Sequence, residues 1–273
     1  PPLPEADRTF SVLQAQIGYV YERQRRYAEA EPFMLRALEY RSKFAGPADS
    51  EIPIMLSNLA SLYSNLRKPA DTLTYGLRAI SWFDENKKEA PNLGFDLLYV
   101  GRAQLELGHL QDGETTLVRA RDVFDRVLLK NDWQRVNVRG ELGFFLAGQE
   151  RYGEAEQVYR SALAIEPELT RPATGWRSLL LARLGSVYRD QARYADAERL
   201  LREAVELDEA DGQIQVRSLG QRLIELASIL RRENRYAETE AILLRALALE
   251  LPESDRASAL NSLGLVYSAN GRN

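Results

Sequence analysis

A repeated segment constrains the fold more than any other feature of this chain. The stretch "RYAEAEPFMLRALEY" at 26–40 recurs in altered form as "RYGEAEQVYRSALAI" at 151, "RYADAERLLREAVEL" at 193 and "RYAETEAILLRALAL" at 235. A second pattern upstream occurs seven times, and each copy is centred on a small anchor residue. The anchors are Gly18, Ala60, Gly101, Gly143, Gly185, Ala227 and Gly264. Their spacings of 42, 41, 42, 42, 42 and 37 residues indicate a solenoid of stacked repeats.

Each repeat resolves into two amphipathic helices. In the fifth repeat, apolar residues occur at helical spacing over 181–188 and again over 197–207, and charged residues occupy the other faces. An alanine follows most anchors by nineteen positions, and two small residues let the helix axes approach closely. These alanines are Ala37, Ala79, Ala120, Ala162, Ala204 and Ala246. Because a helix pair cannot bury its apolar face alone, we expect neighbouring repeats to complete the core.

The repeats account for nearly the whole chain. We predict one all-α solenoid over residues 1–273, with six antiparallel helix pairs over about 9–250 and a lone final helix over about 253–270. The thirteen helices should run for roughly four to five turns each. The seventh unit ends at "SANGRN" without its second helix. We therefore expect the native protein to continue past Asn273.

The fourth repeat carries a family pattern: a Leu-Gly pair, alanines and large apolar residues at set spacings, and a closing proline. Its members are Leu142, Gly143, Leu146, Ala155, Tyr159, Ala162 and Pro167. In this pattern the chain resembles the tetratricopeptide (TPR) family, and its 42-residue period resembles the long repeats of kinesin light chains and of many bacterial proteins. The resemblance implies a right-handed superhelix whose first helices line a concave groove.

The second and third repeats depart from the pattern. Gly76 stands where a large residue is expected, Thr72 and Gly113 replace alanine, and Pro69 opens the second helix. We expect looser packing in these two repeats.

Composition excludes several classes of function. The net charge of −4 and the pI near 5.4 argue against binding to nucleic acid, which requires a basic face. No apolar run reaches the roughly 20 residues that span a bilayer, so we expect a soluble protein without membrane insertion. The chain has no cysteine. The compartment stays unknown, with the cytoplasm slightly favoured.

The residues predict no catalytic, cofactor-binding or metal site. The one histidine, His109, lies in the turn "ELGHLQDG" and has no second histidine or cysteine to complete a metal set. Glycine signatures for phosphates or dinucleotides are absent, because the glycines follow the repeat period. We assign the three tryptophans to anchoring near helix ends, with surface recognition as the minority interpretation. The segment is therefore predicted to be a non-enzyme without cofactors.

A binding face is predicted on the first helices from the geometry of the resembling family, at offsets −6, −3, −2, +1, +4 and +5 from each anchor. Candidate peptide-binding residues are Tyr19, Asn58, Tyr99, Arg102, Phe144, Arg183, Arg189, Arg231 and Arg232. The clamp by which some TPR domains hold a chaperone's terminal carboxylate needs Lys and Asn at −3 and +1. Ala15 and Tyr19 stand there, which disfavours that function.

Charges in the fifth and sixth repeats suggest the chemistry of a ligand. By row, Arg183 should pair with Glu225, and Asp190 with Arg232. Arg189 and its neighbour Arg231 then remain as two unpaired guanidinium groups, which suit a carboxylate or phosphate. We predict a ligand with an acidic residue that meets these two arginines and an apolar one toward Phe144 and Tyr99.

Two classes of function remain open. The first is a non-enzymatic scaffold that binds a peptide or partner helix in its groove, through several shallow contacts. The alternative is the sensor or docking region of a longer enzyme or signalling protein, such as a caspase-like (CHAT-type) protease, with the catalytic residues outside this segment. A third interpretation is self-association through the open C-terminal end.

Overall fold

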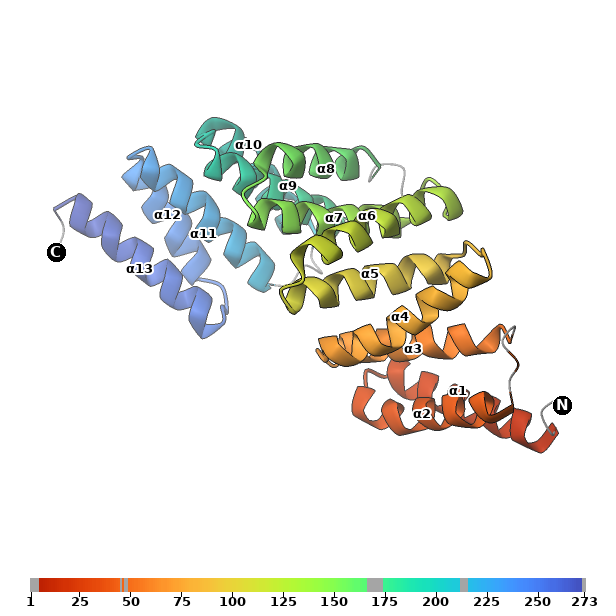
Figure 1. The fold of residues 1–273 in the computed structure, drawn as a ribbon. Coiled ribbons are helices and arrows are strands. Elements are labelled where there is room, and N and C mark those ends of the chain that lie inside the picture. The colour runs from red at the N-terminus through yellow and green to blue at the C-terminus, as the bar shows by residue number, and fades with distance from the viewer. Residues whose placement is uncertain (1–4, 45, 47–48, 166–173, 212–215, 272–273) are drawn as a thin grey trace. The chain divides into compact units, whose positions relative to one another are not determined.

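The computed structural model describes residues 5–44, 46, 49–165, 174–211 and 216–271, and in them thirteen α-helices and no strand (Figure 1). The first six are α1 (Glu5–Arg23), α2 (Tyr27–Phe44), α3 (Glu51–Asn65), α4 (Pro69–Glu85), α5 (Pro91–Glu106) and α6 (Leu110–Val127). The others are α7 (Trp133–Gly148), α8 (Tyr152–Ile165), α9 (Thr174–Asp190), α10 (Tyr194–Ala210), α11 (Val216–Arg232), α12 (Tyr236–Leu247) and α13 (Glu253–Ala269). The predicted all-α helical repeat array is confirmed.

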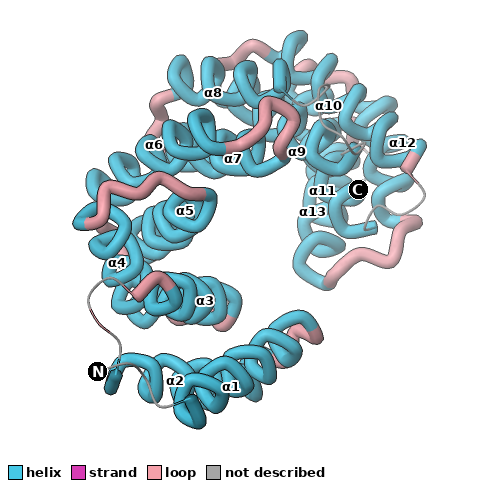
Figure 2. Tube along the Cα trace, turned by 90° about the vertical axis from the view of Figure 1, so that its right-hand side faces the viewer, coloured by secondary structure: helices cyan, strands magenta, loops and turns pink. Residues whose placement is uncertain are grey.

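The chain forms two compact units, Pro1–Leu129 with α1 to α6 and Lys130–Asn273 with α7 to α13. Within each unit, helices pack mainly on their neighbours in sequence, as the tube view shows (Figure 2). The second helix of a pair packs on its own first helix and also on the first helix of the next repeat, as α2 does on α1 and α3. First helices of adjacent repeats also contact each other, as α3 and α5 do.

The small anchors are the points of closest approach within a helix pair. A Cβ atom added to Gly18 would lie 2.7 Å from Met34 Cγ, and one added to Gly143 would lie 2.7 Å from Tyr159 Cε1. Ala162, nineteen residues after Gly143, is fully buried. The first and second helices can therefore cross closely only because these positions are small, as the sequence predicted.

The second and third repeats pack more tightly than expected. A Cβ atom on Gly76 would lie 2.5 Å from Val100 Cγ2, and one on Gly113 would lie 2.4 Å from Leu105 Cδ2. Thr72 is buried, and its hydroxyl donates to the backbone carbonyl of Lys68. The prediction of looser packing was wrong at these positions, because side chains from neighbouring first helices fill the space that the glycines leave.

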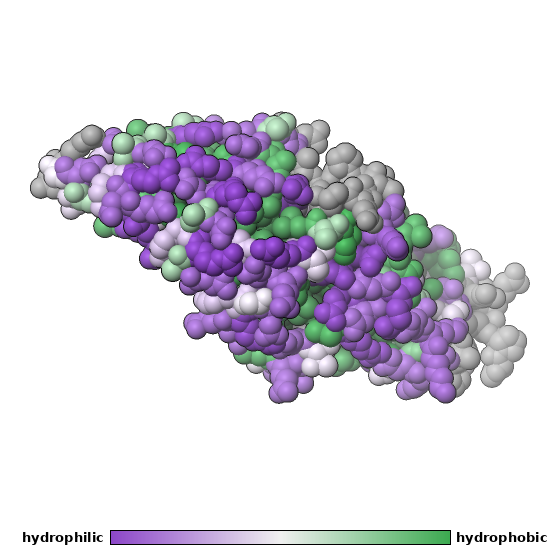
Figure 3. Space-filling view, turned by 90° about the horizontal axis from the view of Figure 1, so that it is seen from above, coloured by the Kyte–Doolittle hydropathy of each residue, from purple (hydrophilic) through white to green (hydrophobic). Residues whose placement is uncertain are grey.

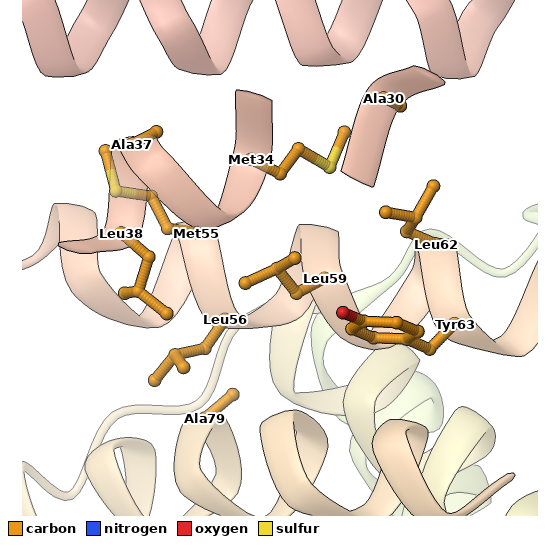
Figure 4. Close-up of a cluster of buried hydrophobic side chains, with 10 residues drawn as sticks. All are labelled: Ala30, Met34, Ala37, Leu38, Met55, Leu56, Leu59, Leu62, Tyr63 and Ala79. Atoms are coloured by element: carbon orange, nitrogen blue, oxygen red, sulfur yellow. The ribbon is translucent and has the colours of Figure 1, made fainter. Parts of the chain in front are cut away.

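The core of the first unit joins the first two repeats. Met34 and Leu38 of α2 pack with Met55, Leu59 and Leu62 of α3, and all five side chains are buried (Figure 4). Each buried side chain of this size contributes roughly 1.5–3 kcal/mol to stability. The interface between these two repeats is thus apolar, which explains why a pair needs its neighbour.

In each repeat, the second residue after the first helix has a left-handed backbone conformation. These residues are Arg25, Arg67, Gly108, Glu150, Ala192, Asn234 and Gly271, with φ between 55° and 83°. At Ala192 the chain makes the hydrogen bonds of a Schellman motif, because the Arg193 N–H donates to the Tyr188 carbonyl at 2.8 Å. The motif reverses the chain direction in three residues and sets the antiparallel pairing.

A glutamate in the second turn of several second helices joins one repeat to the next. The Tyr63 hydroxyl of α3 donates to Glu31 of α2 at 2.9 Å. In the second unit, the Tyr188 hydroxyl and Arg193 Nη1 donate to Glu156 at 2.9 and 3.0 Å. Burial raises the pKa of Glu156, but these donors outweigh it and hold the pKa below its usual value. This glutamate contact recurs at the same repeat positions in both units.

Candidate interaction surface

The nine predicted binding residues all lie on first helices. Four belong to the first unit: Tyr19 on α1, Asn58 on α3, and Tyr99 and Arg102 on α5. Five belong to the second unit: Phe144 on α7, Arg183 and Arg189 on α9, and Arg231 and Arg232 on α11. Tyr99 and Phe144, for which the sequence predicted a shared apolar patch, belong to different units.

In the first unit, α1 and α3 border a hollow of about 390 Å³. The hollow is lined by Tyr19, Glu22, Arg23, Arg25, Tyr27 and Asn65. The guanidinium carbon of Arg23 lies 6.0 Å from the centroid of the exposed Tyr19 ring. An aromatic face, a cation and an amide thus meet at one open surface, where they can contact a polypeptide.

A chain of polar side chains crosses the first helices beside this hollow. Ser61 of α3 donates to the Glu22 carboxylate of α1 at 3.1 Å. Burial raises the pKa of Glu22, and the hydrogen bond from Ser61 offsets this only in part. Burial likewise raises the pKa of the half-buried Tyr99 on α5, which also forms a hydrogen bond with Ser61. Three adjacent first helices therefore share one polar cluster.

Asp96 of α5 is a buried acid one helical turn from this cluster. It is fully buried and accepts a hydrogen bond from the Ser57 hydroxyl of α3 at 2.7 Å, whereas its Oδ1 has no hydrogen-bond partner within the described residues. Burial raises the pKa of Asp96 to about 7, against the lowering effect of Ser57. Asp96 was not among the predicted site residues, although an acid at a position that is apolar in α3 and α9 was a usable signal.

The other two candidates of the first unit differ in exposure. Asn58 of α3 is half-buried, whereas Arg102 of α5 is exposed. Arg102 lies close enough to Tyr99 to favour its ionised form.

In the second unit, Phe144 is the most exposed of the candidate aromatic residues. Its side chain is 62% exposed, and the guanidinium carbon of Arg183 lies 5.0 Å from the centre of its ring. Arg183 Nη1 donates to the Gly140 carbonyl of α7 at 2.9 Å. The predicted pair of Arg183 with Glu225 was wrong, because Arg183 turns toward α7, where an aromatic face and a carbonyl receive it.

Two tryptophans continue this face toward the start of the helices. Trp133 of α7 is exposed, and its ring centroid lies 5.8 Å from that of Trp176 on α9. A ring atom of Trp176 lies 3.9 Å from the Cβ position of Gly140. On α7, Trp133, Gly140 and Phe144 are seven and four residues apart, which places them on one helix face. The sequence predicted an anchoring role for the tryptophans near helix ends, with surface recognition as the minority interpretation, and Trp133 is 46% exposed.

The charged residues of α9 and α11 do not pair as the sequence predicted. Arg189 Nε donates to the neighbouring Asp190 at 2.8 Å, and this bond raises the pKa of the Arg189 guanidinium. The predictions of an unpaired Arg189 and of an Asp190–Arg232 pair were therefore wrong, because Asp190 forms its ion pair with Arg189. The guanidinium of Arg232 instead lies 6.0 Å from the centre of the Tyr194 ring. Arg231 is half-buried, and its guanidinium has no hydrogen bond or ion pair among the described residues.

Glu225 of α11 faces Arg189 across the first helices. It accepts a hydrogen bond from the Ser186 hydroxyl at 3.4 Å. Burial raises the pKa of Glu225, while the positive charge of Arg189 acts against that shift. This face of the second unit therefore carries both charge signs, with a carboxylate that is costly to ionise.

In the described part of the chain, no group of three or more His, Cys, Asp or Glu side chains could hold a metal ion. His109 is exposed in the turn before α6, where the sequence placed it. Among the same residues, no helix is both long and apolar enough to cross a membrane. From above, the surface is mostly hydrophilic, with hydrophobic side chains in narrower patches between (Figure 3).

Stacked antiparallel helix pairs with a partly exposed first-helix face define a helical-repeat protein, of the class that serves as protein-interaction scaffolds. Tetratricopeptide-repeat family models match residues 134–210 and residues 13–44. Over these residues the chain is similar to the tetratricopeptide-repeat family. A comparison with curated proteins gives no match.

Solved structures with the same fold have low sequence identity to this chain. TPR-like repeats assigned to a kinesin light chain of Podosopora anserina are 15% identical, cover 77% of this chain and 100% of their own, and have a TM-score of 0.65. The apo form of the quorum sensor NprR from B. thuringiensis is 15% identical over 96% of this chain and 71% of its own, with a TM-score of 0.74. NprR in complex with its cognate peptide NprX is 14% identical over 97% and 74%, with a TM-score of 0.60.

Proposed function

We propose that this protein is a non-enzymatic scaffold that binds an extended peptide segment along the exposed face of its first helices. The observation that carries the proposal is the Phe144–Arg183 pair. A phenylalanine that is 62% exposed contributes nothing to the core, yet the guanidinium beside it is held 2.9 Å from the Gly140 carbonyl and 5.0 Å from the ring centre. An arginine restrained in this way loses little side-chain entropy when a ligand binds.

The chemistry of this face favours a ligand with an apolar side chain next to an acidic one. The apolar side chain would pack on Phe144, and the acid would meet Arg183, which has further N–H donors beyond the one used by Gly140. The exposed Trp133 is a separate contact for a second apolar side chain. Arg231, which has no ion pair among the described residues, is a separate contact for a second acid. Arg189 contributes less to this proposal than its position in the sequence implied, because Asp190 already pairs with it.

Support also comes from the fold relatives and from the first unit. NprR, of similar fold, binds a cognate peptide. The hollow lined by Tyr19, Arg23 and Asn65 presents donors and an aromatic ring in the first unit, so an extended ligand could have contacts in either unit. An extended surface with several shallow contacts is how solenoids gain affinity.

The proposal is tested with peptides selected on the purified protein from a random display library. Binding of a selected peptide is then measured by fluorescence anisotropy for the native protein and for Phe144→Ala and Arg183→Met. Because a buried aromatic contact contributes about 1–2 kcal/mol or more, each variant should weaken binding by about tenfold. Arg199→Met is the matched control, since this arginine is exposed on the second helix α10.

Either of two outcomes would contradict the proposal. One is that repeated selections yield no peptide with measurable affinity. The other is that the selected peptides bind Phe144→Ala and Arg183→Met as tightly as the native protein while circular dichroism shows unchanged helicity.

A further inference from the structure

Glu225 of α11 is a carboxylate without a cationic partner on the candidate face of the second unit. It lies at offset −2 from the anchor Ala227 and is half-buried. Among the described residues its side chain forms no ion pair and accepts one hydrogen bond, from the Ser186 hydroxyl of α9 at 3.4 Å. A bond of this length from a neutral donor is weak. Burial accordingly raises the pKa of Glu225.

Two other half-buried glutamates of the same unit, Glu156 and Glu198, are each held by two arginines. The partners, at 2.6 to 3.0 Å, are Arg160 and Arg193 for Glu156, and Arg202 and Arg235 for Glu198. Both glutamates are buried enough to be desolvated, yet these arginines help to hold their pKa below its usual value. Glu225 is desolvated in the same way but lacks the arginines, so a cation brought by a ligand would gain an interaction that water screens little.

The guanidinium groups that act on Glu225 through space are paired with aspartates of their own. Arg189 Nε donates to Asp190 at 2.8 Å. The buried Arg222 of α11 lies 2.9 Å from Asp208, measured from its Nη1 to the carboxylate. Each pair adds no net charge, so one negative charge, that of Glu225, is left at this point of the face. A cation is the ligand group that complements it.

Arg183, which has the equivalent position on α9, does not supply that cation. Its Nη1 donates to the Gly140 carbonyl of α7 at 2.9 Å, and its guanidinium carbon lies 5.0 Å from the centre of the Phe144 ring. The face therefore carries a positive group at α7 and a negative group at α11, with α9 between them (Figure 2).

The distance between these two groups sets the spacing of charges on a ligand. Adjacent helix axes lie about 8–10 Å apart, and an extended peptide advances about 3.3 Å per residue. A peptide that crosses the first helices therefore passes from Arg183 to Glu225 in about three residues.

We propose that Glu225 binds a cationic group of the ligand, a lysine or arginine side chain that lies about three residues from the acidic residue at Arg183. This proposal rests on the proposed function of the same face and adds the second charge of its ligand. The cation donates charge-assisted hydrogen bonds to the carboxylate, and Ser186 remains its second donor. The terminal ammonium of a peptide has the same chemistry and is the other possible source of the cation.

The test selects peptides from a random display library, in parallel on the native chain and on Glu225→Gln. This variant keeps the shape of the side chain and removes its charge, so its thermal midpoint should equal or exceed that of the native protein. Peptides selected on the native chain should carry a basic residue about three positions from an acidic one. Those selected on Glu225→Gln should keep the acidic residue and lose the preference for the basic one. Glu206→Gln is the matched control, since this glutamate is exposed on the second helix α10, and it should give the native selection.

A second arm measures the contact itself by fluorescence anisotropy with one selected peptide. Replacing its basic residue by glutamine should weaken binding to the native chain about fivefold to tenfold, and this difference should vanish on Glu225→Gln. Acetylating the amino terminus of the peptide identifies the source of the cation, because it weakens binding only where the terminal ammonium is the group bound.

The proposal is overturned if the selected peptides bind Glu225→Gln as tightly as the native chain, or if they carry no cationic group at this spacing. The proposed function survives both results, because the apolar and acidic residues would still bind Phe144 and Arg183. If no peptide is selected on the native chain, both proposals fail.

Discussion

Asp96 makes the stability of the first unit depend on pH near neutrality. Its carboxylate is fully buried between α3 and α5, and one oxygen has no partner in the described part of the chain. Burial raises its pKa from 3.8 to about 7 in the folded protein. The folded state therefore binds this proton more tightly than the unfolded state does.

The sign of the effect follows from linkage. For an acid with a raised pKa, proton binding stabilises the fold, so this stabilisation is fully present below about pH 4 and is lost as the pH rises through about 7. A difference of about three pKa units at 1.36 kcal/mol per unit is worth about 4 kcal/mol over the whole titration. About 1.4 kcal/mol of it is already lost below pH 5, and local relaxation and water entry reduce the rest, so we expect a loss of about 1–2.5 kcal/mol between pH 5 and pH 8.

Asp96→Asn removes the charge and keeps the shape. The Ser57 hydroxyl can still donate to the amide oxygen, so the variant should retain the fold and be more stable than the native protein at pH 8. At pH 5, where Asp96 is protonated, the two proteins should differ by less than about 1 kcal/mol. The opening free energy of amides in α3 and α5, measured by native-state hydrogen exchange, reports on this unit at each pH.

Asp112→Asn serves as the control, because this aspartate is exposed on α6 of the same unit. The reasoning would be refuted if Asp96→Asn destabilised the first unit equally at pH 5 and pH 8. That result would mean that the ionised carboxylate is well solvated in the folded protein.

Two further predictions concern backbone and packing. Ala192 has a φ of 59°, so Ala192→Gly should stabilise the second unit by about 1 kcal/mol in urea unfolding, and an unchanged or lower midpoint would contradict the strain argument. A Cβ at Gly143 meets a buried tyrosine ring at 2.7 Å, whereas one at Gly264 meets nothing within 4 Å. Gly143→Ala should therefore cost about 1–3 kcal/mol and Gly264→Ala should stabilise α13 by up to about 1 kcal/mol. The same sign for both in thermal unfolding would show that packing does not decide these positions.

The helices and their close crossings could be predicted from the sequence because both depend on local periodicity. The spacing of Gly143 and Ala162 places two small residues at one crossing, and the final helix falls at Glu253–Ala269 as expected. Exposure of His109 followed from its place in a turn. The candidate face stays a prediction, because its offsets were taken from the geometry of the resembling family.

Side-chain partners on that face could not be predicted in the same way. An arginine can reach several acceptors within one helical turn. Arg183 donates to the Gly140 carbonyl, and Arg189 donates to Asp190. Row-by-row pairing assumed that each charge meets its counterpart on the next helix. Which acceptor an arginine bonds to depends on its rotamer and on differences of less than an ångström in distance, and the repeat period does not specify either.

The sequence alone determined the repeat, the pairing of its helices and the small residues at their crossings, because each repeat satisfies the same local pattern and needs only its neighbours. Only the tertiary structure decided which partner each side chain takes. Arg183 and Glu225 occupy equivalent positions of α9 and α11, yet the former donates to the Gly140 carbonyl and the latter accepts from Ser186. The physical reason is that a hydrogen bond depends on rotamers and on the distances between neighbouring helices, which the repeat period leaves open.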